Sequence, residues 1–417
     1  MKFIDLYAGL GCFHYALSSL GHKCVYACEI DPKLNQQYFD FWKLKPDFNI
    51  REVDIKSIPD HDILCAGFPC QPFSLATPPH RRLGFNCPEK GDLFSYIDKI
   101  LKIKQPEYFI LENVSEIKTF ENGSNWNMII KNLTDNYNVR FQVISPHELG
   151  IPQRRKRMFI VGSKSKYPDM PSVFPWFKTD IRDVLQNSPT NSIQLRKDHI
   201  SAIAVWDKFI NMFLGDLTTP STVLADEFGA TYEYEDKTPY SVGMNNLRNR
   251  LGSFGRNLDV LLDEDVWRRL PSYTRRKQFK FPEWKIRTIS QNRIFYENNK
   301  QKLDTWKYEI SKFAPTMRKL IWPLRMRNTS IWDSILQLKP SGVAIFNSDL
   351  SPTFITKKSA VPIIAWERRY LTLVEMRRLQ GLSDDFPLPS DISSAVAALG
   401  NGVNAEVVTE IAKKLIR

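Results

Sequence analysis

Residues 2–11 read KFIDLYAGLG, and this stretch decides the fold that we expect for the chain. The apolar run Phe3–Tyr7 is predicted to form a strand, after which Gly9 and Gly11 let the backbone approach a ligand closely before a helix begins. A second predicted strand, Lys23–Cys28, is followed directly by Glu29, 18 residues after Gly11. Nucleotide-binding α/β folds place an acidic residue at about this distance, where it bonds ribose hydroxyls. Turn glycines and a solvated carboxylate explain the pattern equally well, so it leaves both interpretations open.

Strands and helices continue to alternate as far as about residue 162. Short runs rich in β-branched residues are separated by amphipathic segments such as Phe13–Leu20 and Leu93–Ile103. This pattern is typical of a mostly parallel sheet covered by helices, which predicts an α/β fold. The further predicted strands are Lys23–Cys28, Asp62–Ala66, Tyr108–Glu112, Arg140–Ser145 and Met158–Val161.

The composition is that of a folded and basic protein. The chain has 417 residues, 42% of them hydrophobic, and a formal net charge of +12 at pH 7. This charge favours a polyanionic partner such as nucleic acid, although many basic proteins bind none. No apolar stretch approaches the ~20 residues that cross a bilayer, and no cleavable leader precedes the first strand. We therefore expect a cytoplasmic protein that does not enter a membrane.

The cysteines indicate free thiols in a reducing compartment. None of the six falls in a paired CxxC zinc pattern, so we expect no metal. All six lie in the first 90 residues: Cys12, Cys24, Cys28, Cys65, Cys70 and Cys87.

One of these thiols has the setting of a nucleophile. Residues 67–74 read GFPCQPFS and follow the apolar strand that ends at Ala66. Cys70 therefore lies beyond the carboxyl end of a strand, where ligands bind in open parallel sheets, and the prolines on either side restrict its backbone. The alternative, a buried packing cysteine, suits Cys65 better.

A carboxylate is expected at the same sheet edge. The apolar strand that begins at Tyr108 delivers Glu112, which could face one pocket with Cys70. A desolvated carboxyl group has a raised pKa and can share a proton with a ring nitrogen while a thiolate adds to the ring. Without Cys70, a strand-end carboxylate that caps a helix would be the more ordinary interpretation.

A basic segment, Gln153–Arg157, precedes the last predicted strand of this region. The alternation of side chains along a strand would send Arg155 and Arg157 to one side. Two neighbouring guanidinium groups suit a phosphate or a base carbonyl, although a solvated basic turn is the usual alternative.

The character of the sequence changes after about Ser163. Turn signals crowd in between residues 167 and 175, and eight of the ten tryptophans lie beyond this point. We expect domains at 1–165 and 166–365, followed by a segment 366–417 that returns to the first domain. Ser393–Arg417 has the pattern of one helix that packs back on the first domain through an apolar face. That face is formed by Val396, Leu399, Val403, Val407 and Ile411.

The predicted second domain contains a basic block at Trp267–Arg293 with interleaved aromatic residues. Its cations are Arg268, Arg269, Arg275, Arg276, Lys277, Lys280, Lys285, Arg287 and Arg293. Residues of this kind bind phosphates and read base edges, and the alternative is a basic solvent face over an aromatic core. We expect nucleic-acid contacts here, with Arg275, Arg276 and Lys277 as the candidates.

Taken in order, these blocks resemble the DNA (cytosine-5)-methyltransferase family over residues 3–162 and 366–417. Residues 7–11 resemble its cofactor loop, Pro69–Gln71 its nucleophile block, Glu112–Val114 its acidic block and Gln153–Arg157 its QxRxR block. Its last two blocks resemble the C-terminal stretches Arg369–Glu375, Arg378–Gly381 and Gly400–Val403.

The resemblance implies a Rossmann-like S-adenosylmethionine-dependent methyltransferase domain and a smaller target-recognition domain. Cys70 would add to C6 of a cytosine flipped out of duplex DNA, Glu112 would contact N3, and Arg155 and Arg157 would hold the nucleotide. Gln71 and Ser74 would lie at the DNA. S-adenosylmethionine, which leaves as S-adenosylhomocysteine, would be surrounded by Tyr7, Gly9, Gly11, Glu29, Asp54, Ile55, Pro69, Leu93, Asn401 and Val403.

The resemblance also implies partners and leaves alternatives. It predicts a monomeric modification enzyme of a restriction-modification system, with a cognate restriction endonuclease as a candidate partner.

Three positions depart from the family pattern: Tyr7 replaces the usual Phe, Ile30 replaces a frequent aromatic residue, and Gly402 replaces a common Ser. A cousin that modifies transfer RNA has a Cys-Phe-Thr tripeptide, for which the nearest match here, Pro352–Thr356, lacks the cysteine. A regulator that kept the fold without catalysis is the second alternative.

Overall fold

The computed structural model describes residues 1–69, 83–84, 87, 91–174, 178–322, 330–354 and 360–416. The chain forms two compact units. The first comprises Met1–Pro189, Asp349–Lys358 and Thr372–Arg417, and the second comprises Thr190–Ser348 and Ser359–Leu371. In this division residues 166–189 and 349–358 lie in the first unit and residues 366–371 in the second, and the expected domain boundaries at 165 and 365 stay predictions.

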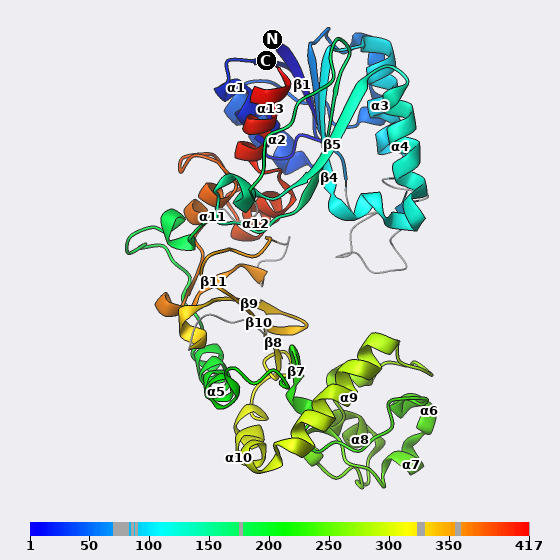
Figure 1. The fold of residues 1–417 in the computed structure, drawn as a ribbon, viewed down its shortest axis with the longest axis vertical. Helices are drawn as coiled ribbons and strands as arrows, with labels where there is room; N and C mark the ends of the chain where they lie inside the picture. The colour runs from blue at the N-terminus through cyan, green and yellow to red at the C-terminus, as the bar shows by residue number, and fades with distance from the viewer. Residues whose placement is uncertain are drawn as a thin grey trace. The chain divides into compact units, whose positions relative to one another are not determined.

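The first unit is built on a six-stranded sheet with the order β2-β1-β3-β4-β6-β5 (Figure 1). Neighbouring strands are parallel except at β6, which is antiparallel to both β4 and β5. The strands are β1 (Lys2–Leu6), β2 (Lys23–Cys28), β3 (Ile63–Gly67), β4 (Tyr108–Val114), β5 (Asn138–Ile144) and β6 (Arg157–Ser163). The predicted α/β class with a mostly parallel sheet is confirmed.

Helices on both faces of the sheet bury its central strands. Figure 1 shows α3 (Leu93–Lys104) and α4 (Ser124–Thr134) on one face and α1 (Cys12–Ser19) with α13 (Ala405–Leu415) on the other. All seven residues of β4 are buried, which explains why its sequence is a nearly continuous apolar run.

The strand order reverses between β1 and β3. The chain passes from β1 to β2 on one side of the sheet and returns to add β3 on the other side of β1. A crevice opens at such a switch point beyond the carboxyl ends of the strands, because the connections leave in opposite directions. The segments that follow β1, β2 and β3 therefore converge at this edge. Helix α2 (Pro32–Trp42) follows β2.

The C-terminal segment forms two helices rather than the single helix expected. Helix α12 (Ile392–Asn401) ends before Gly402, and α13 starts after Asn404, whose side chain accepts a hydrogen bond from Val407 N at 3.1 Å. This cap fixes a new helix start that the apolar periodicity alone did not reveal. Helix α13 packs against α1, and its buried residues include Val407, Val408 and Ile411. Helix α11 (Leu373–Leu379) precedes the pair.

The second unit contains a mostly antiparallel sheet with the order β12-β11-β9-β10-β8-β7, in which only β8 and β10 are parallel. The strands are β7 (Thr222–Leu224), β8 (Lys319–Ile321), β9 (Ile335–Lys339), β10 (Gly342–Phe346), β11 (Ile363–Ile364) and β12 (Arg369–Tyr370). The helices are α5 (Lys197–Phe213), α6 (Pro239–Val242), α7 (Met244–Leu247), α8 (Asp263–Arg269), α9 (Glu283–Asn298) and α10 (Lys300–Ile310).

Tryptophans form much of the core of the second unit. Trp206, Trp306 and Trp322 belong to one buried cluster with Phe209 and Phe295. The indole nitrogens of Trp206 and Trp306 donate to backbone carbonyls at 2.7 and 2.8 Å, so these buried polar atoms are satisfied. Three of the tryptophans of this half are thus core residues.

None of the described helices is long and apolar enough to span a bilayer.

The packing of α13 yields a stability prediction. Truncating the fully buried Ile411 to Ala should lower the free energy of unfolding by about 2–5 kcal/mol, because it removes apolar contacts and leaves a cavity. Lys413→Ala on the exposed side of α13 should cost no more than about 1 kcal/mol, since its ion pair with Glu410 is at the surface. Urea denaturation of both variants measures the difference. Equal stabilities would show that α13 is not part of the core.

Candidate active site

A cavity of about 360 Å³ lies where the segments after β1, β2 and β3 converge, a volume suited to a small organic ligand. Ten of the predicted site residues line it: Tyr7, Gly9, Glu29, Pro69, Leu93, Glu112, Arg155, Arg157, Asn401 and Val403. The structure thus brings N-terminal, central and C-terminal motifs into one space within the first unit.

The glycine loop and Glu29 are joined directly. Gly9 N donates to Glu29 Oε2 and Asp31 N donates to Glu29 Oε1, both at 2.7 Å. Burial raises the pKa of the Glu29 carboxyl, while these backbone donors oppose the shift. Each carboxylate oxygen can accept a second hydrogen bond, so Glu29 can still bind ligand hydroxyls.

Gly11 lies outside this cavity wall and has a packing reason to be glycine. Its φ is +80°, and a Cβ would lie 2.6 Å from Trp42 Nε1 and 2.9 Å from Tyr38 Cε2. A side chain there would therefore displace two aromatic rings. Its predicted cofactor contact stays a prediction.

Asp54 and Ile55 also do not line the cavity. Asp54 accepts a hydrogen bond from Lys56 N at 3.0 Å and caps a short 3-10 helix, and Ile55 packs against the core of the sheet. The wall in this region is formed instead by Phe48–Arg51. Sequence reasoning missed these residues because no periodic pattern marks them. The predicted role of Asp54 and Ile55 at the cofactor stays a prediction.

Tyr7, which replaces the family's usual phenylalanine, makes a bond that phenylalanine could not. Its hydroxyl donates to Leu93 O at 2.8 Å and so links the end of β1 to the start of α3. Both residues line the cavity. Ile30, the second position that departs from the family pattern, also lines the cavity, and 62% of its surface is exposed.

Glu112 is held by an ion pair at the end of β4. Arg157 Nε lies 3.0 Å from Glu112 Oε1, and both side chains are largely buried. Burial raises the pKa of the Glu112 carboxyl, although the charges of Arg157 and Arg155 oppose the shift. A carboxyl group in this state is poised to share a proton with a ligand.

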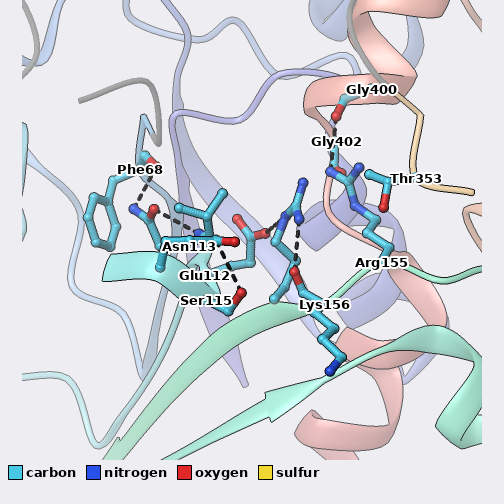
Figure 2. A network of polar contacts seen from close by, with 12 residues as sticks. Phe68, Glu112, Asn113, Ser115, Arg155, Lys156, Thr353, Gly400 and Gly402 are labelled. Carbon is cyan, nitrogen blue, oxygen red and sulfur yellow. Dashed lines mark hydrogen bonds and ion pairs between the residues drawn. The ribbon is translucent and has the colours of Figure 1, made fainter. Parts of the chain in front are cut away.

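The neighbouring Asn113 is bonded to the backbone that follows β3. Its side-chain amide donates to Phe68 O at 3.2 Å, and its Oδ1 accepts from Val114 N at 2.8 Å (Figure 2). The Phe68 backbone, which lies two residues before Cys70, is thereby fixed to the end of β4. Sequence reasoning placed Asn113 in the acidic block without giving it this role.

Arg155 is directed to the C-terminal segment. Its guanidinium Nη2 donates to Gly400 O at 3.0 Å and to Gly402 O at 2.7 Å (Figure 2). A Cβ on Gly402, the third departure from the family pattern, would lie only 3.2 Å from Cys12 Sγ. Arg155 and Arg157 therefore both line the cavity but bind different partners, one on the C-terminal segment and the other on β4.

Cys70, Gln71 and Ser74 lie outside the described residues. The alternative thiol, Cys65, is completely buried within β3, and burial raises the pKa of this thiol well above its usual value. Burial also raises the pKa of Cys12, Cys24 and Cys28 to about 12. These four cysteines are poor nucleophiles because the thiolate is the reactive form.

The three predicted DNA contacts lie in the second unit and differ in their surroundings. Arg275 donates to the backbone carbonyls of Leu270 and Arg268, whereas Arg276 and Lys277 are exposed and form no ion pair or side-chain hydrogen bond with a described residue. Among the described residues, no three His, Cys, Asp or Glu side chains are grouped to hold a metal ion.

Comparisons with known proteins agree with this arrangement. The sequence model of a family described as C-5 cytosine-specific DNA methylase matches residues 1–417. Type II methyltransferase M.MspI of Moraxella sp. is 36% identical over 205 residues, which are 48% of this chain, and the match spans about half, 48%, of that protein. Type II methyltransferase M.BanI of Aneurinibacillus aneurinilyticus is 26% identical over 100% of this chain and 96% of its own.

A solved structure shows the same fold. The Entamoeba histolytica methyltransferase EhMeth superposes with a TM-score of 0.54 at 15% identity, covering 100% of this chain and 98% of its own.

The raised pKa of Glu112 yields a pH prediction. The folded protein holds this proton more tightly than the unfolded chain, so its contribution to stability is full at low pH and is lost as the pH rises through the raised pKa. The Glu112→Gln variant has no carboxyl group at this position, so it does not lose stability in this way as the pH rises. The stability of the variant relative to wild type should therefore grow between pH 4.5 and 7.5 in urea denaturation. Glu52→Gln, a change at an exposed carboxylate, provides the control. A difference that shrinks with pH would show instead that Arg157 holds the pKa of Glu112 below its usual value.

Proposed function

Because the chain belongs to the C-5 cytosine-specific DNA methylase family, we propose that it methylates C5 of a cytosine flipped out of duplex DNA, with S-adenosylmethionine as the donor. The observation that carries this proposal is the single cavity that contains Glu112 with Arg157 and also the glycine loop with Glu29.

The described residues fit the proposed cofactor. When bound, S-adenosylmethionine supplies the methyl group and leaves as S-adenosylhomocysteine. Glu29 retains acceptor capacity for ribose hydroxyls, and the apolar wall of Phe68, Ile50 and Phe48 suits a flat base. Tyr7 and Leu93 close another part of the wall, and Asn401 and Val403 add the C-terminal contribution.

The proposed chemistry uses Cys70 as nucleophile and Glu112 at the base. The Cys70 thiolate forms a bond to C6, while Glu112 shares a proton with N3, so that electron density rises at C5. After C5 takes the methyl group, a water molecule accepts the C5 proton, the C5–C6 double bond forms again, and the bond between sulfur and C6 breaks to regenerate the thiolate. Burial of Glu112 supports this role because it keeps a proton on the carboxyl to higher pH.

The surrounding residues then have positioning roles. Arg157 orients Glu112 through their ion pair, and Arg155 holds the backbone of residues 400–402 against the cavity. A base inside the duplex cannot reach this space, so the cytosine must be extruded. We assign Gln71 and Ser74 to the DNA side of the flipped nucleotide.

We assign catalysis to the first unit and target recognition to the second. The relatives M.MspI and M.BanI are named Type II methyltransferases, which supports a role as the modification component of a restriction-modification system. A cognate endonuclease is the corresponding partner, and the enzyme itself acts as a cytoplasmic monomer.

The nucleophile can be tested by covalent trapping. Wild-type protein incubated with S-adenosylmethionine and duplex DNA containing 5-fluorocytosine should form a complex that survives denaturing electrophoresis, because fluorine blocks the elimination step. Cys70→Ala should abolish both the complex and methylation but keep DNA binding, whereas Cys87→Ala, a change at a partly exposed cysteine, should form the complex normally.

Each alternative gives a different result. Methylation of transfer RNA but not of duplex DNA would contradict the proposed substrate. Absence of a trapped complex on diverse DNA, despite measured binding of the cofactor, would favour a regulator. Retained turnover in Cys70→Ala would refute the nucleophile.

A further inference from the structure

The long helix α9 of the second unit (Figure 1) has an unusual distribution of side chains. Lys285 and Asn292 are buried on its inner side, whereas Trp284 and Ile294 are 69% and 59% exposed. A helix at the surface of a domain normally buries its apolar residues and exposes its polar ones. On α9, Ile289, Phe295 and Tyr296 are buried in this way, but the two large apolar side chains of Trp284 and Ile294 also face outward.

Polar bonds fix the inner side of α9 to β7. The Asn292 side chain accepts from Leu224 N at 2.8 Å and donates to Thr222 O at 2.9 Å. Lys285 Nζ donates to Tyr273 O, and Ile289 packs beside Leu224 in a small core cluster. The helix is thus attached by directional bonds that fix its rotation.

A buried ion pair holds α9 at the next residue, Arg293. Arg293 Nε lies 3.0 Å from Glu227 Oε2, and its guanidinium lies 4.4 Å from the ring centres of both Tyr232 and Tyr234. Glu227 is completely buried and also accepts from the hydroxyl of Tyr273 at 2.7 Å. Because these bonds hold the inner side of α9 in place, its outer side forms a rigid surface.

These contacts divide the nine cations of the basic block into two groups. Five have structural partners: Arg268 pairs with Glu264, Arg269 binds Asn257 O, Arg275 binds Leu270 O, Lys285 binds Tyr273 O and Arg293 pairs with Glu227. The other four are exposed and have no ion pair or side-chain hydrogen bond within the described part of the chain: Arg276, Lys277, Lys280 and Arg287.

Four of the exposed residues of α9 form one stripe; Glu283, Glu297 and Asn298, near the two ends of the helix, are exposed as well. Trp284, Arg287, Gln291 and Ile294 follow one another at intervals of three or four residues, so they share a face of the helix. The stripe is about 15 Å long at ~1.5 Å per residue, which corresponds to four or five base pairs at ~3.4 Å each. The cations Arg276, Lys277 and Lys280 lie in the segment that leads into the helix.

We propose that the outer face of α9 lies in the major groove of the duplex and reads its sequence, an inference that rests on the proposed function. The groove admits an α-helix, arginine suits the acceptors of guanine, and glutamine suits the edge of adenine. Arg287 and Gln291 therefore contact base edges, and Ile294 and Trp284 provide apolar contacts such as those to thymine methyl groups. Arg276, Lys277 and Lys280 bind phosphates, since their positive charge complements the duplex.

The proposal is tested by methylation of a duplex library with randomised sequence, read by bisulfite sequencing. Arg287→Ala and Gln291→Ala should each lower the rate at the wild-type consensus by about five- to 100-fold and relax the preference at one base pair. Arg276→Ala should instead weaken binding to all duplexes and reduce the salt dependence of binding by about one ion. Lys312→Ala and Gln301→Ala, changes at an exposed cation and amide elsewhere in the second unit, should do neither.

The outcomes separate this inference from the function on which it rests. A wild type that neither binds nor methylates duplex DNA overturns both. A wild type with a clear consensus that Arg287→Ala and Gln291→Ala leave unchanged overturns the role of α9 alone. A change of sedimentation in the Trp284→Ala variant, with base preference intact, would assign the face to a protein contact and also overturn the proposal. Unchanged circular dichroism and binding of S-adenosylhomocysteine verify that each variant is folded.

Discussion

Two hydrogen bonds from Arg155 hold together the parts of the chain that form the cavity. The guanidinium joins a loop before β6 to the carbonyl oxygens of Gly400 and Gly402, which are 245 and 247 residues further along. Arg155 is almost fully buried, and burying a charged group is costly unless it is hydrogen-bonded, so the two carbonyl oxygens stabilise its guanidinium through Nη2. This constraint brings Asn401 and Val403 to the same cavity as the glycine loop and Glu29. The position of Glu112 depends on the adjacent Arg157, so one short basic segment organises both halves of the proposed site.

Much of the first unit could be predicted from the sequence because its signals are local. Apolar runs such as Tyr108–Glu112 mark strands that are buried on both faces, and the parallel arrangement then places their carboxyl ends at one edge. Glu29 and Glu112 were identified for this reason. The partners of Arg155 could not be predicted, since they depend on contacts between residues far apart in the sequence. The break between α12 and α13 was also missed, because the cap formed by Asn404 interrupts an otherwise continuous apolar pattern.

The second unit illustrates a different limit of sequence reasoning. The composition of its basic block predicts a polyanion-binding surface, but composition does not separate cations that bind solvent or phosphate from those that hold the fold. The structure makes this distinction through Glu227, a buried carboxylate that fixes Arg293, and through the carbonyl oxygens that bind Arg275. By the same criterion Arg287 remains a candidate for DNA contact, since it lies between Trp284 and Gln291 on the exposed stripe of α9.

Through Arg155, residues from both ends of the chain form one proposed cofactor site. Calorimetric titration with S-adenosylhomocysteine tests it most directly, with Arg155→Met compared with Arg154→Met, a change at the exposed neighbouring arginine. Loss of the bonds to Gly400 and Gly402 should weaken binding at least about tenfold, since hydrogen bonds to charged groups contribute about 1.5–3 kcal/mol each. Arg154→Met should bind like wild type. Equal affinities for the two variants, both folded at the temperature of measurement, would contradict the claim that Arg155 and the C-terminal segment complete the site.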